Sequence, residues 1–178
     1  LLALGHQRIA CIGGPEQLHS SEQRVQGWQQ AMRQVGMCPD LLVYGDFSVN
    51  GGYLAMRTLL AAAPAARPTA VLACNDLMAM GALRAVHEFG LRVPQDVAVV
   101  GYDDIELASY TQPPLSTVAQ PVKAMAQQAL AWLLQGMQAD KTRPATSATQ
   151  LLVPALVTRA SSKPAARPSM QTLSGGVV

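Results

Sequence analysis

Polar side chains and one aromatic ring follow the short apolar runs of this sequence. In chain order these residues are Ser20, Arg24, Phe47, Asn75, Asp103 and Gln120. An arginine donates a rigid fork of hydrogen bonds, a carboxylate accepts from paired hydroxyls, and the amides of Asn and Gln do both. A phenylalanine ring can cover the apolar face of a sugar or stack on a flat base. The set therefore favours noncovalent binding of a small polyol.

Each of these residues alone also has a plainer interpretation. Asn75 and Asp76 precede a predicted helix, and one of them, most naturally Asp76, could simply be its N-terminal cap. Asp103 could belong to a turn, Arg24 could be a solvated surface residue, and Phe47 could be a core residue. The binding interpretation depends on all of them meeting at one edge of one sheet.

Signatures of catalysis are missing from the sequence. It contains no Gly-x-Gly-x-x-Gly segment, no phosphate loop and no Gly-x-Ser-x-Gly elbow. Asp103 and Asp104 are adjacent, so in an extended chain they point to opposite sides and are poorly placed as an acid/base pair. The three histidines and three cysteines are scattered and show no metal-ligand spacing. We expect no enzyme, no cofactor and no metal site.

Apolar runs alternate with helical patterns along most of the chain. Runs without polar alternation predict strands at residues 8–12, 41–44, 69–73, 97–100, 116–119 and 151–157. Helical spacing of apolar residues predicts helices at 22–35, 51–62, 77–89 and 122–138. Such strands are expected where helices cover both faces of a parallel sheet, so we predict an α/β fold with a three-layer, doubly wound parallel sheet. Ligands bind such sheets at the carboxyl ends of the strands, where the six residues above lie.

The composition excludes several classes of protein. The 178 residues are 49% hydrophobic and 13% charged, which fits a globular core rather than wholesale disorder. The net charge is only +2 and no basic stripe follows a helix, so we expect no direct contact of this chain with nucleic acid. The apolar runs are too short to span a bilayer, and the sparse cysteines favour the cytoplasm. From residue 161 onward Ser, Pro, Ala and Gly dominate, which predicts a disordered tail.

The first residues read as the end of a helix rather than the start of a chain. Leu1–Leu4 are apolar, and Gly5 follows as a C-terminal helix cap. No initiating methionine or charged leader precedes them. We expect the sequence to be a fragment that lacks an N-terminal portion.

Several motifs occur together in this chain. They include Leu-Gly-His-Gln-Arg-Ile-Ala at 4–10, Arg-Val-Gln-Gly-Trp at 24–28, Gly-Asp-Phe at 45–47, Asn-Asp-Leu-Met-Ala-Met-Gly-Ala at 75–82, Gly-Tyr-Asp-Asp-Ile-Glu-Leu-Ala at 101–108 and Pro-Pro-Leu-Ser-Thr-Val at 113–118. In combination they resemble the sensor half of the lactose/galactose repressor family (LacI/GalR). The resemblance covers nearly everything from residue 1 to about residue 159.

The resemblance implies a type I periplasmic-binding-protein-like sensor of two α/β subdomains, preceded in the family by a helix-turn-helix head and a hinge helix. On this basis we expect residues 1–117 to form the C-terminal subdomain and residues 118–147 to be a crossover segment that belongs to the N-terminal subdomain. Residues 148–160 would be the return strand, followed by the disordered tail at 161–178. Family members bind operator DNA as homodimers and respond to a small effector, usually a sugar.

The resemblance also assigns roles to residues. Those that match the family's effector contacts are Arg24, Asn75 and Asp103, the aromatic Phe47, Gln120 at the crossover and, for some members, Ser20. Purine-binding members carry an additional arginine where this chain has Leu18, which argues against a purine. The loops around Phe47 and Asp103 look most like those of ribose-operon repressors, so we expect ribose or another pentose.

The sequence leaves open which surface forms a dimer and whether the protein is a repressor. The resemblance implies dimerisation through the helix from Asp76 to Glu88 and the segment from Ile105 to Tyr110, although Met80 and Leu107 could instead belong to the core. A periplasmic sugar-binding protein of a transport system would share the fold and is the alternative to a repressor. The motifs at 101–108 and 113–118 favour the repressor, in which a sugar that bridges the two subdomains would shift the population toward one closure angle.

Overall fold

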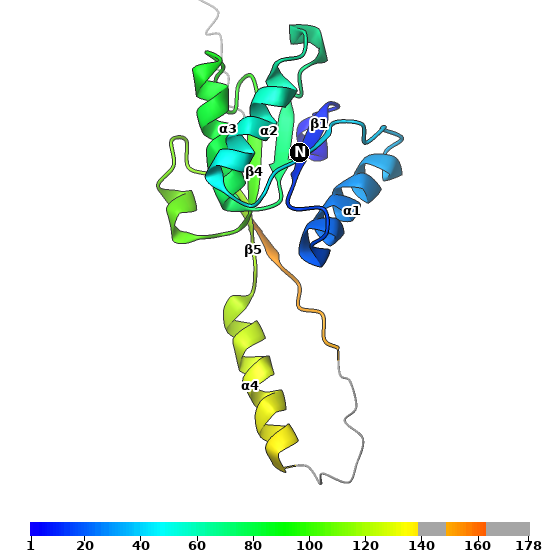
Figure 1. Cartoon of the computed structure of the whole chain (residues 1–178), viewed down its shortest axis with the longest axis vertical. Helices are drawn as coiled ribbons and strands as arrows, with labels where there is room; N and C mark the ends of the chain where they lie inside the picture. The colour runs from blue at the N-terminus through cyan, green and yellow to red at the C-terminus, as the bar shows by residue number, and fades with distance from the viewer. Residues whose placement is uncertain (139–148, 163–178) are drawn as a thin grey trace, which may run out of the picture.

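Six strands form a sheet at the centre of the molecule (Figure 1). The computed structural model describes residues 1–138 and 149–162. Across the sheet the strands are β2 (Leu42–Tyr44), β1 (Ile9–Gly13), β3 (Ala70–Ala73), β4 (Ala98–Asp103), β5 (Ser116–Ala119) and β6 (Ala155–Val157). The first five of these are parallel, which confirms the predicted sheet, whereas β6 runs antiparallel to β5.

Helices cover both faces of this sheet. The covering helices are α1 (His19–Gln34), α2 (Val49–Leu60) and α3 (Asp76–Glu88). The chain also contains α4 (Val122–Gln138), which does not cover the sheet, and the short 3₁₀ helices η1 (Leu2–Leu4), η2 (Pro64–Ala66) and η3 (Glu106–Ser109). The crossover through α1 runs from β1 to β2, and the crossovers through α2 and α3 run in the opposite direction along the sheet. Because parallel crossovers are right-handed, α1 lies on one face and α2 and α3 lie on the other, as Figure 1 shows. The direction reverses between β1 and β3, which is where open α/β sheets bind ligands.

The two helices on one face, α2 and α3, pack backbone against backbone. A Cβ atom on Gly52 would collide with the main chain of Met78, and one on Gly81 would collide with the main chain of Val49. Both glycines are buried. This close approach is possible only because neither position carries a side chain.

Helices α2 and α3 begin at side-chain caps. The hydroxyl of Ser48 accepts a hydrogen bond from the Gly51 amide at 2.9 Å, and Oδ1 of Asn75 accepts one from the Met78 amide at 2.9 Å. The prediction that Asp76 caps α3 is therefore wrong. Asp76 is the first residue of the helix, and its carboxylate is directed toward the loop after β4 and toward β5.

The beginning of the chain forms a single turn of 3₁₀ helix instead of an α-helix. Gly5 ends it with a φ of 87°, and its amide donates to the carbonyl of Leu2 at 2.9 Å. Only glycine adopts this left-handed conformation without a steric cost, so the predicted glycine cap is confirmed.

The segment after β6 is part of the folded sheet. The Ser161 amide donates to the Pro114 carbonyl at 3.0 Å, and its hydroxyl donates to the Val99 carbonyl at 2.6 Å and accepts from the Ser116 amide at 2.8 Å. Ser162 donates to the hydroxyl of Ser116 at 2.7 Å, and both residues of this segment are buried. The predicted disorder from residue 161 is wrong for these two residues, because they complete hydrogen bonds of β4 and β5. The remaining residues, 163–178, lie outside the described part of the chain.

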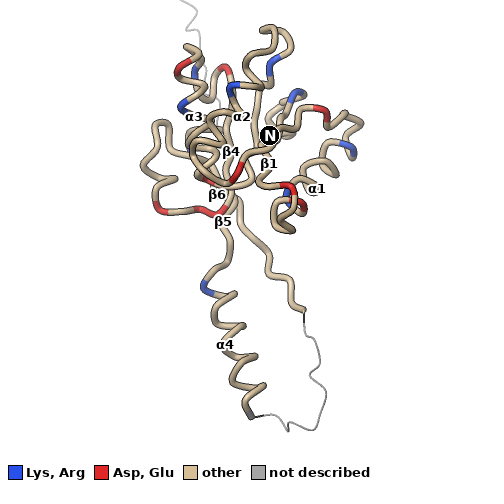
Figure 2. Tube along the Cα trace, viewed as in Figure 1, with Lys and Arg blue, Asp and Glu red and all other residues tan. Residues whose placement is uncertain are grey.

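Helix α4 extends away from the sheet (Figure 1), and its bounds are those predicted from the sequence. Figure 2 shows that this helix carries almost no charge, because Lys123 is the only charged residue in the segment 122–138. Its apolar side chains are exposed, up to 82% for Met137.

The predicted last strand at 151–157 is shorter in the structure, because only Ala155–Val157 pairs with β5 and Leu151 is exposed. Within the described residues, no helix combines the length and apolar character that crossing a membrane requires.

Candidate functional site

Three of the predicted site residues meet at the carboxyl ends of β3, β4 and β5, which Arg24 reaches from α1. Nη2 of Arg24 lies 3.3 Å from Oδ1 of Asp103, and Nε2 of Gln120 donates to the same oxygen at 2.6 Å. The other terminal nitrogen of Arg24 donates to the carbonyl of Cys74, at the end of β3. The guanidinium also lies over the ring of Tyr102, 3.9 Å from its centroid. Its orientation is thus fixed by a carboxylate, a carbonyl and an aromatic face.

This arrangement is open to a ligand. The side chains of Arg24 and Asp103 keep 18% and 29% of their surface exposed. A partly solvated ion pair of this kind contributes at most about 1 kcal/mol to stability. Both described contacts of the Asp103 carboxylate use Oδ1, so its second oxygen is available to accept from a ligand hydroxyl.

Asn75 and Phe47 form a second group beside the first. Nδ2 of Asn75 donates to the carbonyl of Phe47 at 2.9 Å. Phe47 has a φ of 66°, and its ring lies so close to Gly14 that a side chain there would collide with it. Asn75 also caps α3, so the plainer interpretation of this residue is correct, and one hydrogen of its amide is left for a ligand. Its role as an effector contact stays a prediction.

The two groups adjoin through the backbone, because Cys74, which binds Arg24, directly precedes Asn75. Ser20 lies exposed on the first turn of α1, four residues before Arg24 and therefore on the same face of the helix. Asp46, which also follows a strand, accepts from the amide of Ser48 at 2.9 Å and from its hydroxyl at 2.6 Å. These hydrogen bonds hold the pKa of Asp46 below its ordinary value. Because they engage its carboxylate, Asp46 shapes the turn before α2.

The neighbouring carboxylates Asp103 and Asp104 have different partners. Asp104 accepts from Nη2 of Arg159 at 2.7 Å, and Nη1 of Arg159 donates to the Leu115 carbonyl at 2.8 Å. Arg159 was not predicted as a site residue from the sequence, because 55 residues separate it from Asp104. No local spacing signals such a contact. The two aspartates are thus parts of separate ion pairs rather than an acid/base pair.

Asp103 and Asp104 also form a strained turn. Their φ angles are 111° and 57°, in the region that residues other than glycine rarely adopt. A residue held in this way costs roughly 1–3 kcal/mol and persists only where its surroundings fix it. Immediately beneath the turn lies Asp76, which is fully buried and whose pKa is raised by that burial. From the sequence, Asp76 was expected only to cap a helix.

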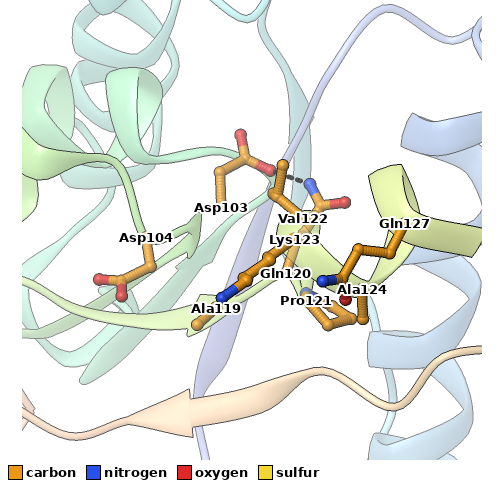
Figure 3. Close-up of a pocket in the computed structure, with 9 residues that line it drawn as sticks. All are labelled: Asp103, Asp104, Ala119, Gln120, Pro121, Val122, Lys123, Ala124 and Gln127. Carbon is orange, nitrogen blue, oxygen red and sulfur yellow. Dashed lines mark hydrogen bonds between the residues drawn. The ribbon is translucent and has the colours of Figure 1, made fainter. Parts of the chain in front are cut away.

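A hollow of about 710 Å³ lies between the end of β4 and the start of α4 (Figure 3). Its polar lining comes from Asp103, Asp104, Gln120, Lys123 and Gln127. In Figure 3 the carboxylate of Asp103 points toward Gln120, whereas Asp104 points away from both. The hollow therefore places hydrogen-bonding groups of the sheet opposite those of α4, which suits a small polar ligand.

A second cavity of about 770 Å³ runs along the α1 face of the sheet. Its lining is mainly apolar and includes Trp28, Leu72, Val100 and Val118, with Arg24 among its polar residues. A polyol would leave most of its hydroxyls without partners against these apolar walls. Asp103 and Gln120 line the first hollow and Arg24 lines this cavity, so their ion pair lies between the two, whereas Ser20, Phe47 and Asn75 line neither.

A comparison with protein families agrees with this geometry. The model of the periplasmic binding protein-like domain matches residues 1–162 of the chain. The chain belongs to this family. This periplasmic binding protein-like domain is 43% identical over 164 residues to the ribose operon repressor of Escherichia coli (strain K12), an alignment that covers 90% of the chain and 48% of the repressor. The chain spans about half the length of the curated relatives it matches.

Solved structures of repressors resemble the domain as well. A Lac repressor dimer bound to operator and the anti-inducer ONPF superposes with a TM-score of 0.83 at 39% identity, over 91% of the chain and 55% of the repressor. A complex of the transcriptional regulator CelR with cellobiose gives a TM-score of 0.80 at 40% identity, over 90% of the chain and 48% of the regulator. The resemblance to LacI-type repressors predicted from the motifs is thus confirmed, and these relatives are regulators rather than transport proteins.

Proposed function

We propose that this domain is part of the effector sensor of a DNA-binding transcriptional repressor, that its effector is a small sugar, and that it catalyses no reaction. The observation that carries the proposal is the joining of Arg24, Asp103 and Gln120 at the carboxyl ends of β3, β4 and β5. These groups offer donors and acceptors at hydrogen-bonding distance from one another, as adjacent hydroxyls of a sugar require. Phe47 supplies an aromatic surface on the neighbouring loop.

A pentose, ribose above all, is the effector that we propose. One relative is named for the ribose operon, and another was solved with cellobiose, so both names point to a sugar as the effector. Leu18, exposed in the loop before α1, offers no hydrogen bonds to a purine.

The domain would form one wall of a cleft between two subdomains. We propose that residues 1–117 belong to the C-terminal subdomain and residues 148–160 return to it, although β5 extends the sheet to Ala119. Residues 118–147 would cross to the other subdomain, which would cover the exposed apolar side chains of α4. A sugar bound between the subdomains would stabilise one closure angle and so change the affinity for DNA.

We further propose that the repressor acts as a homodimer in the cytoplasm and contacts operator DNA through an N-terminal head. Leu77, Leu107 and Tyr110 are exposed on α3 and on the segment after β4, and Tyr110 is 76% exposed. Exposed apolar side chains of this kind are typical of an interface. They support the dimer surface predicted at residues 76–88 and 105–110.

The proposal can be tested with the complete protein that carries this domain. Its affinity for DNA from the region upstream of its own gene would be measured by fluorescence anisotropy, with and without D-ribose, D-xylose, L-arabinose or cellobiose. We expect one of these sugars to change the DNA affinity by about 5- to 150-fold, the usual range of coupling between two sites. A protein that binds a sugar but no DNA would instead be a sugar-binding protein of another kind.

A further inference from the structure

Asn75 and Asp76, at the start of α3, support loops on opposite sides of them. Asn75 donates to the carbonyl of Phe47, in the loop after β2. Asp76 accepts from the amide of Ile105 at 2.9 Å, in the loop after β4. The first loop carries the aromatic residue of the candidate site, and the second carries Asp103. Two adjacent residues, Asn75 and Asp76, thus each hold one of the two loops that carry the candidate site.

Asp76 lies beneath the turn at Asp103 and Asp104 without reaching the surface. Its Oδ1 accepts from the hydroxyl of Thr117 at 2.6 Å, and that hydroxyl in turn accepts from the amide of Asp104 at 3.4 Å. The amides of Asp104 and Ile105 are therefore both held, one through Thr117 and one directly. The first belongs to the peptide between Asp103 and Asp104, inside the strained turn, and the second belongs to the peptide that follows the turn.

Space for this carboxylate is provided by a glycine. A Cβ atom on Gly101 would collide with Oδ1 of Asp76. Gly101 lies in β4 only two residues before Asp103. Asp76 is fully buried, so no ligand in the hollow can touch it. Its two described hydrogen bonds come from neutral donors, whereas Asp103 and Asp104 each face an arginine.

We propose that Asp76 is a positioning residue of the effector site, which fixes the left-handed turn so that the carboxylate of Asp103 faces Arg24 and Gln120. This inference rests on the proposed function of the site. An acceptor at this place holds the turn in the geometry that binds the sugar before the sugar arrives, so less ordering is needed on binding. Removing it frees the turn to relax toward ordinary φ angles, and Asp103 then leaves its two partners.

The test compares three variants of the complete protein with the wild type by calorimetry, using D-ribose or whichever of D-xylose, L-arabinose and cellobiose the wild type binds. Asp76→Ala should weaken binding by about tenfold, the lower end of what outer supporting residues contribute at metal sites. Asp76→Asn should bind within about threefold of the wild type, because its oxygen can accept from Ile105 and its amide can donate to Thr117. Met56→Ala removes a fully buried side chain of α2 and serves as a control for lost stability. If Asp76→Ala does not fold, Thr117→Val takes its place, with Thr58→Val on the exposed side of α2 as its control.

Unchanged affinity in Asp76→Ala, or in Thr117→Val as its substitute, would overturn the proposal, as would an equal loss in the matched control. If the wild type binds none of the four sugars, the proposed function fails and a second measurement decides the role of Asp76. Native-state hydrogen exchange should then show about tenfold faster exchange than in the control for the amide whose acceptor is removed, which is Ile105 in Asp76→Ala and Asp104 in Thr117→Val. Equal exchange rates would show that Asp76 does not hold the turn.

Discussion

The carboxylate of Asp104 lies 2.7 Å from the guanidinium of Arg159, and this ion pair joins the loop after β4 to the segment after β6. Arg159 also donates to the Leu115 carbonyl, so one side chain connects three parts of the chain. Both side chains are partly buried, since 22% of the Arg159 surface and 26% of the Asp104 surface remain exposed.

Replacing Arg159 by Ala should lower the free energy of unfolding by about 1–3 kcal/mol, because a half-buried carboxylate and a carbonyl lose their partners. Arg92 gives a matched control, since it forms an ion pair with Asp96 at 3.0 Å but is 72% exposed. Arg92→Ala should cost less than about 1 kcal/mol. Urea unfolding of both variants measures the two changes in the free energy of unfolding. Equal losses in Arg159→Ala and Arg92→Ala would contradict the structural role of Arg159.

The crossing of α2 and α3 predicts a strong effect at Gly81. A methyl group there meets the main chain of Val49, which cannot move aside as a side chain would. Gly81→Ala should therefore destabilise the protein by about 1–3 kcal/mol or more through overpacking. Gly27→Ala, in the exposed part of α1 with open space around it, should instead be neutral or stabilise by up to about 1 kcal/mol. Thermal unfolding that ranks the two variants the other way would refute the close crossing.

Asp76 should make stability depend on pH in an unusual direction. Its pKa is raised by burial, so the folded state holds this proton more tightly than the unfolded state does. The contribution of Asp76 is then most favourable below the unfolded pKa, and it is lost as the pH rises through the folded pKa. Relative to Asp76→Asn, the wild type should become less stable between acid and neutral pH, as measured by urea unfolding. A difference that is constant or grows with pH would mean that the carboxylate is stabilised in its charged form.

The exposed apolar surface of α4 predicts that this chain alone binds hydrophobic dyes. Leu133 and Met137 are 66% and 82% exposed in the structure. The double variant Leu133→Glu, Met137→Glu should reduce ANS fluorescence and self-association, and should change the free energy of unfolding by no more than about 0.5 kcal/mol per site. A wild-type chain that is monomeric by sizing and binds no dye would contradict the exposed surface.

Local sequence patterns predicted the strands, the helices and the edge of the sheet where the site lies. Apolar runs and helical spacing depend on neighbours in sequence, which is why α4 was placed to the residue. The contacts of Arg159 and Ser161 were not predicted, because each joins segments more than forty residues apart. Asp76 was misjudged for another reason: a charged residue type is rarely fully buried, and only the space left by Gly101 makes its position possible.

The central claim is that Asp103, held by Arg24 and Gln120, binds the hydroxyls of a sugar effector. Calorimetric titration of D-ribose into the complete protein tests it most directly when Asp103→Ala is compared with Asp96→Ala, because Asp96 lies in a separate ion pair and its side chain is similarly exposed, 32% against 29% for Asp103. The loss of hydrogen bonds to a charged group costs about 1.5–3 kcal/mol, so the Asp103 variant should bind roughly 10- to 150-fold more weakly while the Asp96 variant binds as the wild type does. Ribose binding that is equally tight in the wild type and in Asp103→Ala would contradict the claim.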